Sequence, residues 1–231
     1  MIKRDTLNGL VSHISKLGFV PGTVIDIGAA NGTYCLYDTF TSSRHLLIEP
    51  LIERENNLVN LKKKYKNLDY IIGGVGAKED ERKINVHLDH LDGSSLFKEQ
   101  IADFDGIERK VNITTLDKLY MDLKLESPFL LKIDTQGSEL EILNGASKVL
   151  ELTECVVLEA SFFEFYKGAP LIGEIVIFMK ERGFVLYDIA DITYRMLDGA
   201  CAQIDLAFVK QNGFFRESNL YATIEQWNER S

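Results

Sequence analysis

Hydrophobic positions in the first third of the chain change between two spacings. Residues 6–17 carry leucine, valine and isoleucine at intervals of three and four, which places them on one face of an amphipathic helix. Short apolar runs follow at 24–27, 45–49 and 70–76, and residues 53–66 have helical spacing again. Strands that alternate with helices in this way are typical of a parallel sheet with crossover helices.

The pattern breaks after the third apolar run. Residues 83–88 and 110–114 alternate between apolar and polar positions like strands, and the loop between them holds the turn-rich sequence Asp92-Gly-Ser-Ser95. No change in composition marks a linker here. We therefore expect residues 80–115 to form a short β insertion within the same domain. Its place after the third strand puts it over the carboxyl ends of the sheet, where α/β folds bind ligands.

The second half of the chain returns to alternating strands and helices. The predicted elements are strands at 129–134, 154–159, 184–188 and 205–209, and helices at 138–146 and 171–182. Ser138-Glu-Leu-Glu141 has the form of a capping box that opens the first of these helices. The whole pattern predicts one α/β domain over residues 1–231, with a mostly parallel seven-stranded sheet and helices on both faces. An N-terminal helical segment at 1–20 and a C-terminal extension at 211–231 flank it.

A glycine loop follows the first predicted strand. Asp26 lies near the end of that strand, and Gly28 and Gly32 come directly after it. A dinucleotide site uses a third glycine to receive a pyrophosphate, and that glycine is missing here. A carboxylate at Asp26 would repel a phosphate but suits a cation, such as the amino group of S-adenosylmethionine. An ordinary strand–turn–helix connection is the alternative interpretation.

An acid also ends the second predicted strand. Glu49 comes about 20 residues after the glycine loop, where an acid accepts hydrogen bonds from ribose hydroxyls in nucleotide-binding folds. A nicotinamide enzyme would use the same residue, so Glu49 alone does not identify the cofactor. An adenine edge could lie against the backbone of the next strand end. The predicted cofactor-binding residues are Asp26, Gly28, Ala29, Asn31, Gly32, Glu49, Pro50, Val75 and Gly76.

Two further strands end on acids, Asp134 and Glu159. The carboxyl ends of parallel strands meet at one edge, so both acids would face the same crevice as the cofactor. Methyl transfer to an alcohol needs an in-line approach and removal of a proton, and a carboxylate can position the hydroxyl or act as the base. Lys132 shares a strand face with Asp134, and a purely structural ion pair between them is the alternative.

The predicted insertion and the segment after the fifth strand supply further candidates. His90 is a candidate base, although surface positions are the favoured interpretation for it and His87, with metal ligands as a further alternative. Mg²⁺ would suit the oxygens of the two strand-end acids, but no third ligand is evident and no metal site is assigned. Aromatic residues at 162–166 could stack on a sugar or fill the core. The predicted substrate-binding residues are Ser94, Ser95, Gln136, Phe162 and Tyr166.

Composition narrows the class of partner. The formal net charge of −9, from 35 acidic and 26 basic residues, argues against nucleic acid. The three cysteines, Cys35, Cys155 and Cys201, are widely spaced and form no C-x-x-C motif. They therefore indicate neither a disulfide framework nor a zinc site. No apolar run is long enough for a signal peptide or a membrane span. We therefore expect a cytoplasmic protein without a membrane partner.

Several motifs together resemble the FkbM-type methyltransferases. The most specific segment is Leu131-Lys-Ile-Asp-Thr-Gln-Gly137 followed by Glu139-Leu-Glu-Ile-Leu-Asn-Gly-Ala146. The other matching stretches are Asp26–Gly32, Ile48-Glu49-Pro50, Gly93–Leu96, Thr115-Leu-Asp117, Leu158-Glu159 and Gln203–Val209. The similarity covers about residues 20–210. The family pattern often has Glu where this chain has Gln136, which removes a charge beside the site.

This resemblance implies a Rossmann-like class I methyltransferase fold and S-adenosylmethionine as the cofactor. It also implies O-methylation of hydroxyl groups on a sugar or another polar small molecule, with a small-molecule or glycan acceptor as the partner. Two alternatives remain at this stage. One is a nicotinamide-dependent Rossmann oxidoreductase, and the other is a non-catalytic S-adenosylmethionine-binding module.

Overall fold

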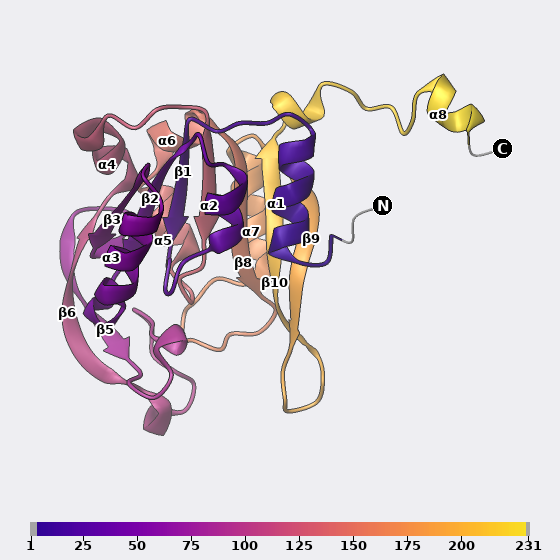
Figure 1. Cartoon of the computed structure of the whole chain (residues 1–231). Coiled ribbons are helices and arrows are strands. Elements are labelled where there is room, and N and C mark those ends of the chain that lie inside the picture. The colour runs from indigo at the N-terminus through magenta and orange to yellow at the C-terminus, as the bar shows by residue number, and fades with distance from the viewer. Residues whose placement is uncertain (1–3, 230–231) are drawn as a thin grey trace.

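The computed structural model describes residues 4–229. Residues 1–3 and 230–231, which belong to the predicted N-terminal segment and C-terminal extension, lie outside the described residues. A seven-stranded sheet forms the centre of the molecule in the order β3-β2-β1-β7-β8-β10-β9 (Figure 1). Its strands are β1 (Thr23–Ile27), β2 (Arg44–Glu49), β3 (Leu68–Ile72), β7 (Phe129–Ile133), β8 (Thr153–Ser161), β9 (Phe184–Tyr194) and β10 (Cys201–Lys210). Only β10 runs antiparallel to its neighbours, which confirms the predicted mostly parallel sheet.

Helices cover both faces of this sheet, as predicted. One face packs against α1 (Leu7–Lys16), α2 (Tyr34–Thr39) and α3 (Glu55–Lys64). The other packs against α4 (Leu116–Leu123), α5 (Glu139–Asn144), α6 (Ser147–Glu151) and α7 (Ile172–Glu181). Consecutive strand residues point to opposite faces, so Val24 enters the first core and Ile25 the second.

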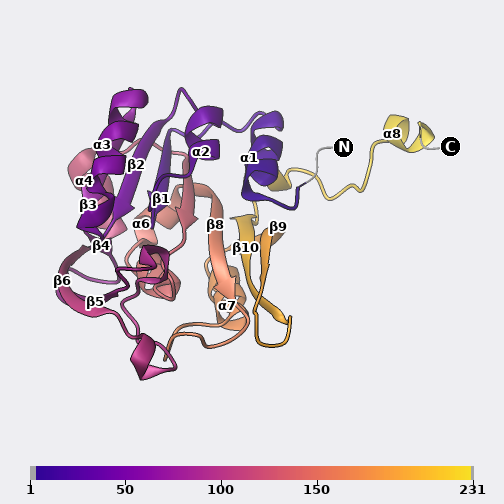
Figure 2. The same ribbon diagram turned by 60° about the horizontal axis from the view of Figure 1, so that its bottom comes forward.

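The predicted insertion, residues 80–115, pairs with the preceding segment 74–75 to form a separate three-stranded sheet in the order β4-β6-β5. Its strands are β4 (Gly74–Val75), β5 (Asp80–Val86) and β6 (Ile107–Thr114), and the short helices η2 (Leu91–Gly93) and η3 (Ala102–Phe104) lie between β5 and β6. The third strand of the large sheet is therefore shorter than the predicted run 70–76. It ends at Ile72, because the next residues turn away and β4 pairs with β6 instead of β2. Figure 2 shows the small sheet at one end of the large one.

The C-terminal extension leaves the sheet after β10. It contains η4 (Phe214–Arg216) and α8 (Ile224–Asn228). Phe214 and Phe215 pack their rings against Phe19, whereas α8 stands away from the body in both views (Figures 1 and 2). Among residues 4–229, no helix is both long enough and apolar enough to span a membrane.

Candidate functional site

The order of the strands creates a crevice between β1 and β7. From β1 the chain continues to β2 on one side, and β7 continues to β8 on the other, so the connections diverge at this point. Ligands bind at such switch points of α/β sheets, beyond the carboxyl ends of the strands. A cavity of about 500 Å³ opens there. Its wall includes the glycine loop, the strand-end acids and residues of the insertion.

The glycine loop passes very close to the end of β7. Gly28 has a φ of +72°, and a Cβ atom on it would lie only 1.7 Å from the carbonyl oxygen of Asp134. No residue other than glycine fits this crossing. Gly28 and Ala29 donate backbone hydrogen bonds to the carbonyl of Ile48, at 2.9 and 3.2 Å. The loop is thereby fixed between β2 and β7 at the mouth of the cavity.

Glu49 lines the cavity beside this loop. Its two carboxylate oxygens accept hydrogen bonds from the backbone N–H groups of Ala30, at 2.8 Å, and Leu51, at 2.9 Å. Burial raises the pKa of Glu49, and the two backbone N–H groups act against that rise. Each oxygen keeps lone pairs that can accept further hydrogen bonds from ligand hydroxyls. Glu49 therefore borders the cavity with acceptor atoms that a ribose could use, and its role in ribose binding stays a prediction.

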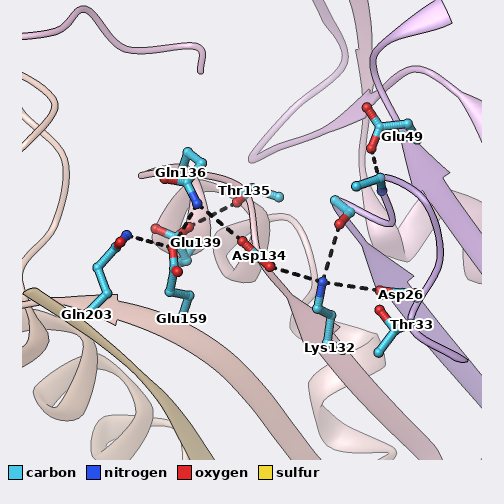
Figure 3. A network of polar contacts seen from close by, with 12 residues as sticks. Asp26, Thr33, Glu49, Lys132, Asp134, Thr135, Gln136, Glu139, Glu159 and Gln203 are labelled. Carbon is cyan, nitrogen blue, oxygen red and sulfur yellow. Dashed lines mark hydrogen bonds and ion pairs between the residues drawn. The ribbon is translucent and has the colours of Figure 1, made fainter. Parts of the chain in front are cut away.

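Asp26 lies beneath the loop rather than in the cavity wall. Its side chain is fully buried, and the hydroxyl of Tyr37 donates a hydrogen bond to Oδ2. The ammonium of Lys132 lies 3.5 Å from Oδ1 (Figure 3). The cation beside Asp26 in this structure is thus a lysine of the same chain, and the carboxylate does not border the space where a cofactor amino group could bind.

Lys132 connects three groups at the floor of the site. Its ammonium lies 3.3 Å from Oδ2 of Asp134, which confirms the ion pair considered from the sequence, and it donates to the carbonyl of Gly28 at 3.3 Å (Figure 3). Burial alone would lower the pKa of Lys132, but Asp134 and Asp26 outweigh it and raise the pKa above its ordinary value. The lysine is therefore a permanent positive charge under the glycine loop.

Glu159 forms the opposite wall from Glu49. Its Oε2 accepts hydrogen bonds from the side-chain amides of Gln136, at 2.9 Å, and Gln203, at 2.7 Å (Figure 3). The Gln136 nitrogen also lies 3.3 Å from Oδ1 of Asp134. This amide therefore stands between the two carboxylates that the sequence analysis considered for a magnesium ion. Both acids border the cavity, as predicted.

The acids at this end of the site raise one another's pKa values. Burial and the nearby Asp134 raise the pKa of Glu159 to about 8, with Glu139 and Asp205 adding to the effect. Burial and Asp134 likewise raise the pKa of Asp205 to about 7, against the opposing charge of Lys132. Perturbed carboxylates gathered in a crevice are typical of sites that exchange protons with a ligand.

The insertion closes one side of the cavity. Ser94 and Ser95 line it, and the Ser95 hydroxyl donates to the backbone carbonyl of Gln136 at 2.7 Å. Arg54 pairs with Asp92 of the insertion and donates to Oδ1 of Asn31 in the glycine loop at 2.8 Å. This arginine ties the insertion to the loop across the mouth of the site.

Some predicted residues lie elsewhere. His90 and Phe162 are exposed, and neither they nor Gly76 border the cavity. His90 stands on the turn before η2. Tyr166 is buried behind the wall, where its hydroxyl lies 3.1 Å from the carbonyl of Gly93 and 3.3 Å from Oε1 of Gln136. It supports Gln136 rather than bordering the cavity itself.

The predicted capping box at Ser138 is wrong. Ser138 has backbone angles of −91° and 5° and makes no side-chain capping bond, and its hydroxyl is buried without a partner. The tight turn before it leaves the serine out of the extended conformation that a cap needs. Glu139 accepts from Thr135 Oγ1 and the backbone N–H of Gly137 instead, both at 3.1 Å. Glu141 pairs with Arg82 of the insertion.

Sequence reasoning missed four residues that shape the site: Tyr37, Arg54, Gln203 and Asp205. Gln203 and Asp205 carried a usable signal, because they alternate with Ile204 and Leu206 in the last strand and so share one face. In the register of the sheet, Asp205 lies opposite Glu159. The other two, Tyr37 in α2 and Arg54 at the end of the short helix η1 (Ile52–Arg54), have partners in other segments that no local pattern indicates.

The cavity fits S-adenosylmethionine on the chemistry of its wall. A volume of about 500 Å³ lies within the range of small-molecule sites. Glu49 offers acceptors for ribose hydroxyls, and the buried side chains of Leu51, Val75, Ile113 and Ile142 provide an apolar flank for an adenine ring. The acids Asp134 and Glu159, at the far side, suit a positively charged reacting centre.

Comparison with known proteins is consistent with this site. The model of the methyltransferase FkbM domain matches residues 26–186. No curated protein is similar enough in sequence to count as a relative. Among solved structures, the chain is similar to precorrin-6y C5,15-methyltransferase from Geobacter metallireducens GS-15, with 13% identity over 88% of this chain and 87% of that one and a TM-score of 0.46. Magnesium protoporphyrin IX methyltransferase from Synechocystis PCC 6803, solved with bound SAM, gives 11% identity over 88% and 77% of the two chains and a TM-score of 0.46.

The family match covers more than half of the chain and contains the parts that build the cavity. It takes in the glycine loop, Glu49, the insertion and the two acids Asp134 and Glu159. The resemblance seen in the sequence is therefore confirmed, and a nicotinamide-dependent oxidoreductase is not favoured. The chain belongs to the FkbM methyltransferase domain family, and S-adenosylmethionine is its cofactor.

Proposed function

We propose that this protein transfers the methyl group of S-adenosylmethionine to a hydroxyl of a sugar or a similar polar small molecule in the cytoplasm. The observation that carries the proposal is the pair of carboxylates, Asp134 and Glu159, on the cavity wall beyond the glycine loop. Bound S-adenosylmethionine supplies a methyl group on a positively charged sulfur. The residues of this chain then have to hold the cofactor, place the acceptor and remove its proton.

Holding the cofactor falls to the first half of the sheet. Glu49 binds the ribose hydroxyls, and the glycine loop lets the backbone approach the ligand closely. Lys132 supports this loop from below through the carbonyl of Gly28. The apolar residues of β4 and β6 cover the adenine. These roles place the reacting methyl group beside Asp134, because the cavity runs from Glu49 past the loop to the end of β7.

Residues at the ends of the strands in the second half of the sheet, with Ser94 of the insertion, position the acceptor. The wall there combines carboxylates with the hydroxyl of Ser94, which can hydrogen-bond to a polyhydroxylated ligand, whereas the Ser95 hydroxyl is engaged by the carbonyl of Gln136 and the N–H of Phe97. Polar groups of this kind select ligands that can satisfy them, since a buried polar group left unpaired costs about 1–3 kcal/mol. This favours a sugar or a similar polyol over an apolar acceptor.

The charge of the wall further limits the acceptor. The charged residues that border the cavity are four acids, Glu49, Asp92, Asp134 and Glu159, and one base, Lys132. Lys132 is already paired with two carboxylates and Asp92 with Arg54, which leaves Glu49 and Glu159 as the wall acids without a cationic partner among the described residues, and the cofactor brings a single net positive charge. A phosphorylated acceptor would therefore meet net repulsion. Neutral sugars and amino sugars fit the wall better than sugar phosphates or nucleotide sugars.

A non-catalytic binding module is the second candidate, because Gln136 replaces a commoner acid. The cluster of pKa-perturbed carboxylates around the cavity favours an enzyme over this candidate. Calorimetry and a transfer assay together distinguish an enzyme from a non-catalytic binding module. We expect S-adenosylhomocysteine to bind more tightly than NAD in both cases, and label transfer to occur only if the protein is an enzyme.

The decisive experiment is transfer of a labelled methyl group from S-adenosylmethionine across a panel of acceptors. The panel contains neutral oligosaccharides, amino sugars, sugar phosphates, nucleotide sugars, small phenols and peptides. We expect label in the neutral or amino sugars. Label only in peptides would overturn the sugar proposal, and preference for a phosphorylated sugar over its unphosphorylated counterpart would overturn the charge argument. Heat-inactivated protein is the control for non-enzymatic methylation.

A further inference from the structure

We propose that Glu159 is the general base that removes the proton of the acceptor hydroxyl, and that the side-chain amides of Gln136 and Gln203 aim it. This inference rests on the proposed transfer to a hydroxyl group. It assigns different tasks to the two acids of the site. Glu159 accepts the proton, whereas Asp134 belongs to the ion-pair network that supports the loop.

The two amides engage the same oxygen of Glu159. Gln136 Nε2 lies 2.9 Å and Gln203 Nε2 2.7 Å from Oε2, from opposite neighbouring segments (Figure 3). Within residues 4–229, the other oxygen, Oε1, receives no hydrogen bond. Glu159 itself borders the cavity. With Oε2 held by both amides, Oε1 is the oxygen left to accept a proton from a ligand.

Gln136 is itself held in one orientation. Its backbone lies in the left-handed region, at a φ of +53°, which is unusual for a residue other than glycine. The hydroxyl of Tyr166 lies 3.3 Å from Oε1 of Gln136, and Ser95 donates to its backbone carbonyl. Because the carboxylate oxygens of Asp134 and Glu159 accept hydrogen bonds, the amide nitrogen of Gln136 points toward them, and its amide oxygen faces the Tyr166 hydroxyl, whose single proton also serves the carbonyl of Gly93. A strained backbone supported in this way is typical of functional sites.

Gln203 reaches Glu159 from β10. In the antiparallel register Gln203 lies opposite Ser161, two residues beyond Glu159 on β8. Its amide nitrogen also lies 3.4 Å from the Ser161 hydroxyl. A strand supports this amide, so its position is set by the sheet rather than by a loop. The two amides therefore hold Glu159 from a rigid strand and from a braced turn.

Asp134 is poorly suited to accept the proton. Its Oδ2 is paired with the ammonium of Lys132 and its Oδ1 faces the Gln136 amide, at 3.3 Å in each case. Protonation of Asp134 would break an ion pair at the floor of the site. Glu159 has no cationic partner within ion-pair distance among the described residues, so a proton on it disrupts no such pair.

Burial, and then the charged surroundings, make Glu159 a stronger base than an ordinary glutamate. Asp134, Glu139 and Asp205 face it from three other elements, and with burial they raise its pKa to about 8. The Gln136 amide acts in the opposite direction because it stabilises the charged form. Tyr166 also faces Glu159, and its own pKa is raised, first by burial, so it stays neutral. A positive charge bound in the cavity would lower the pKa of Glu159 toward neutrality, close to the optimum for a general base.

The bond changes balance with this assignment. The acceptor oxygen forms a bond to the methyl carbon while the bond between that carbon and sulfur breaks, and its electron pair stays on sulfur. The hydroxyl proton passes to Oε1 of Glu159. The products are a methyl ether, S-adenosylhomocysteine and a protonated Glu159, which releases its proton to solvent after the product leaves.

The first test follows the protonation of Glu159 directly and needs no acceptor. Infrared titration of protein carrying ¹³C-labelled glutamate carboxyls, with Glu159→Gln for assignment, gives the midpoint of Glu159. We expect Gln203→Leu to raise this midpoint by about one to two pH units, since it removes a hydrogen bond to the charged form. Gln211→Leu, at an exposed position, is the matched control and should leave it unchanged. An unmoved midpoint in Gln203→Leu would overturn the role of the amides.

The second test uses the first acceptor that the wild-type protein methylates in the panel. Glu159→Gln should lower kcat by about 10²- to 10⁴-fold, the usual contribution of a general base, while its affinity for S-adenosylhomocysteine stays within a few-fold. In Gln203→Leu the rate should reach half its maximum at a higher pH, in step with the infrared midpoint. Full activity of Glu159→Gln would overturn the base assignment alone. Absence of transfer by the wild-type protein to any hydroxyl would overturn both the proposed function and this inference.

Discussion

Asp26 and Lys132 face one another across two neighbouring parallel strands, with Oδ1 of the acid 3.5 Å from the ammonium. The register of β1 and β7 pairs these two positions directly. The aspartate is fully buried, and the lysine is 8% exposed to solvent. The lysine also holds the carbonyl of Gly28 and the carboxylate of Asp134. A buried ion pair thus forms the floor on which both the glycine loop and one candidate catalytic acid rest.

Replacing Lys132 by methionine should destabilise the fold. The substitution keeps the length of the side chain but leaves Asp26 as a buried charge without a counterion, and breaking one side of a buried pair costs about 3–5 kcal/mol. Urea denaturation gives the free energy of unfolding. Lys63→Met, the same change on the exposed side of α3, is the control and should have little effect. A loss below about 1 kcal/mol at Lys132 would mean that the pair does not support the floor of the site.

Replacing Glu49 by glutamine should weaken cofactor binding. The amide nitrogen of the new side chain would face the backbone N–H of Ala30 or Leu51, two donors that now bind the carboxylate, and one acceptor for the ribose is lost. Hydrogen bonds to a charged group contribute about 1.5–3 kcal/mol, which corresponds to roughly 10- to 100-fold in Kd. Calorimetry with S-adenosylhomocysteine measures the change. Glu55→Gln, six residues further on, should bind like the wild-type protein, and equal affinities in the two variants would contradict the ribose role.

Replacing Arg54 by alanine should speed the release of the cofactor. Arg54 joins Asp92 of the insertion to Asn31 of the glycine loop across the mouth of the cavity. A partly exposed ion pair contributes about 0–1 kcal/mol, so we expect an increase in koff of at most about fivefold with little change in kon. Stopped-flow displacement of S-adenosylhomocysteine measures both rates. Arg109→Ala removes the ion pair with Glu53 instead and should leave koff as it is. A change confined to kon would argue against Arg54 as a closure.

The stability of the protein should fall as the pH rises toward 8. Burial and Asp134 raise the pKa of Glu159 to about 8, far above the ordinary value of 4.5 that applies in the unfolded chain. Between these two values the folded state binds more protons than the unfolded state, so the free energy of unfolding decreases with pH. Asp205, whose pKa is raised to about 7, contributes in the same direction.

Replacing Glu159 by glutamine removes the larger part of this dependence. We expect the wild-type protein to lose at least about 1 kcal/mol more than Glu159→Gln between pH 5 and pH 8.5, since one unit of pKa displacement corresponds to about 1.4 kcal/mol. Urea unfolding at the two pH values gives the comparison. Equal losses of unfolding free energy in the two proteins would show that the pKa of Glu159 is not raised in the folded state.

The strand ends were predictable from the sequence. Apolar runs mark where each buried strand stops, and in a parallel sheet these ends meet at one edge. This rule predicted that four acids would face one crevice; Glu49, Asp134 and Glu159 border the cavity, whereas Asp26 is buried beneath the glycine loop. The glycine at position 28 was also informative, because only glycine tolerates the crossing beneath Asp134.

Partners between distant segments were not predictable in the same way. The period of a strand indicates which face a residue lies on, but it does not say which strand lies beside it. Asp26 was therefore assigned to a ligand cation, although β7 brings Lys132 next to it. Gln203 belongs to the last strand, which joins the sheet between β8 and β9 and reaches Glu159 from there. His90 lies on a turn whose direction no local pattern determines.

The sequence by itself determined the class of fold and most of the acids at the carboxyl edge, because local periodicity and glycine geometry act over a few residues, and its motifs indicated the cofactor through their resemblance to the FkbM-type methyltransferases. Only the tertiary structure decided which of those acids is paired and which is left to face a ligand. Strand order joins Lys132 to Asp26, and the antiparallel β10 brings Gln203 to Glu159. Charge and hydrogen-bond partners set the chemistry of a carboxylate, and here those partners come from segments far apart in the chain.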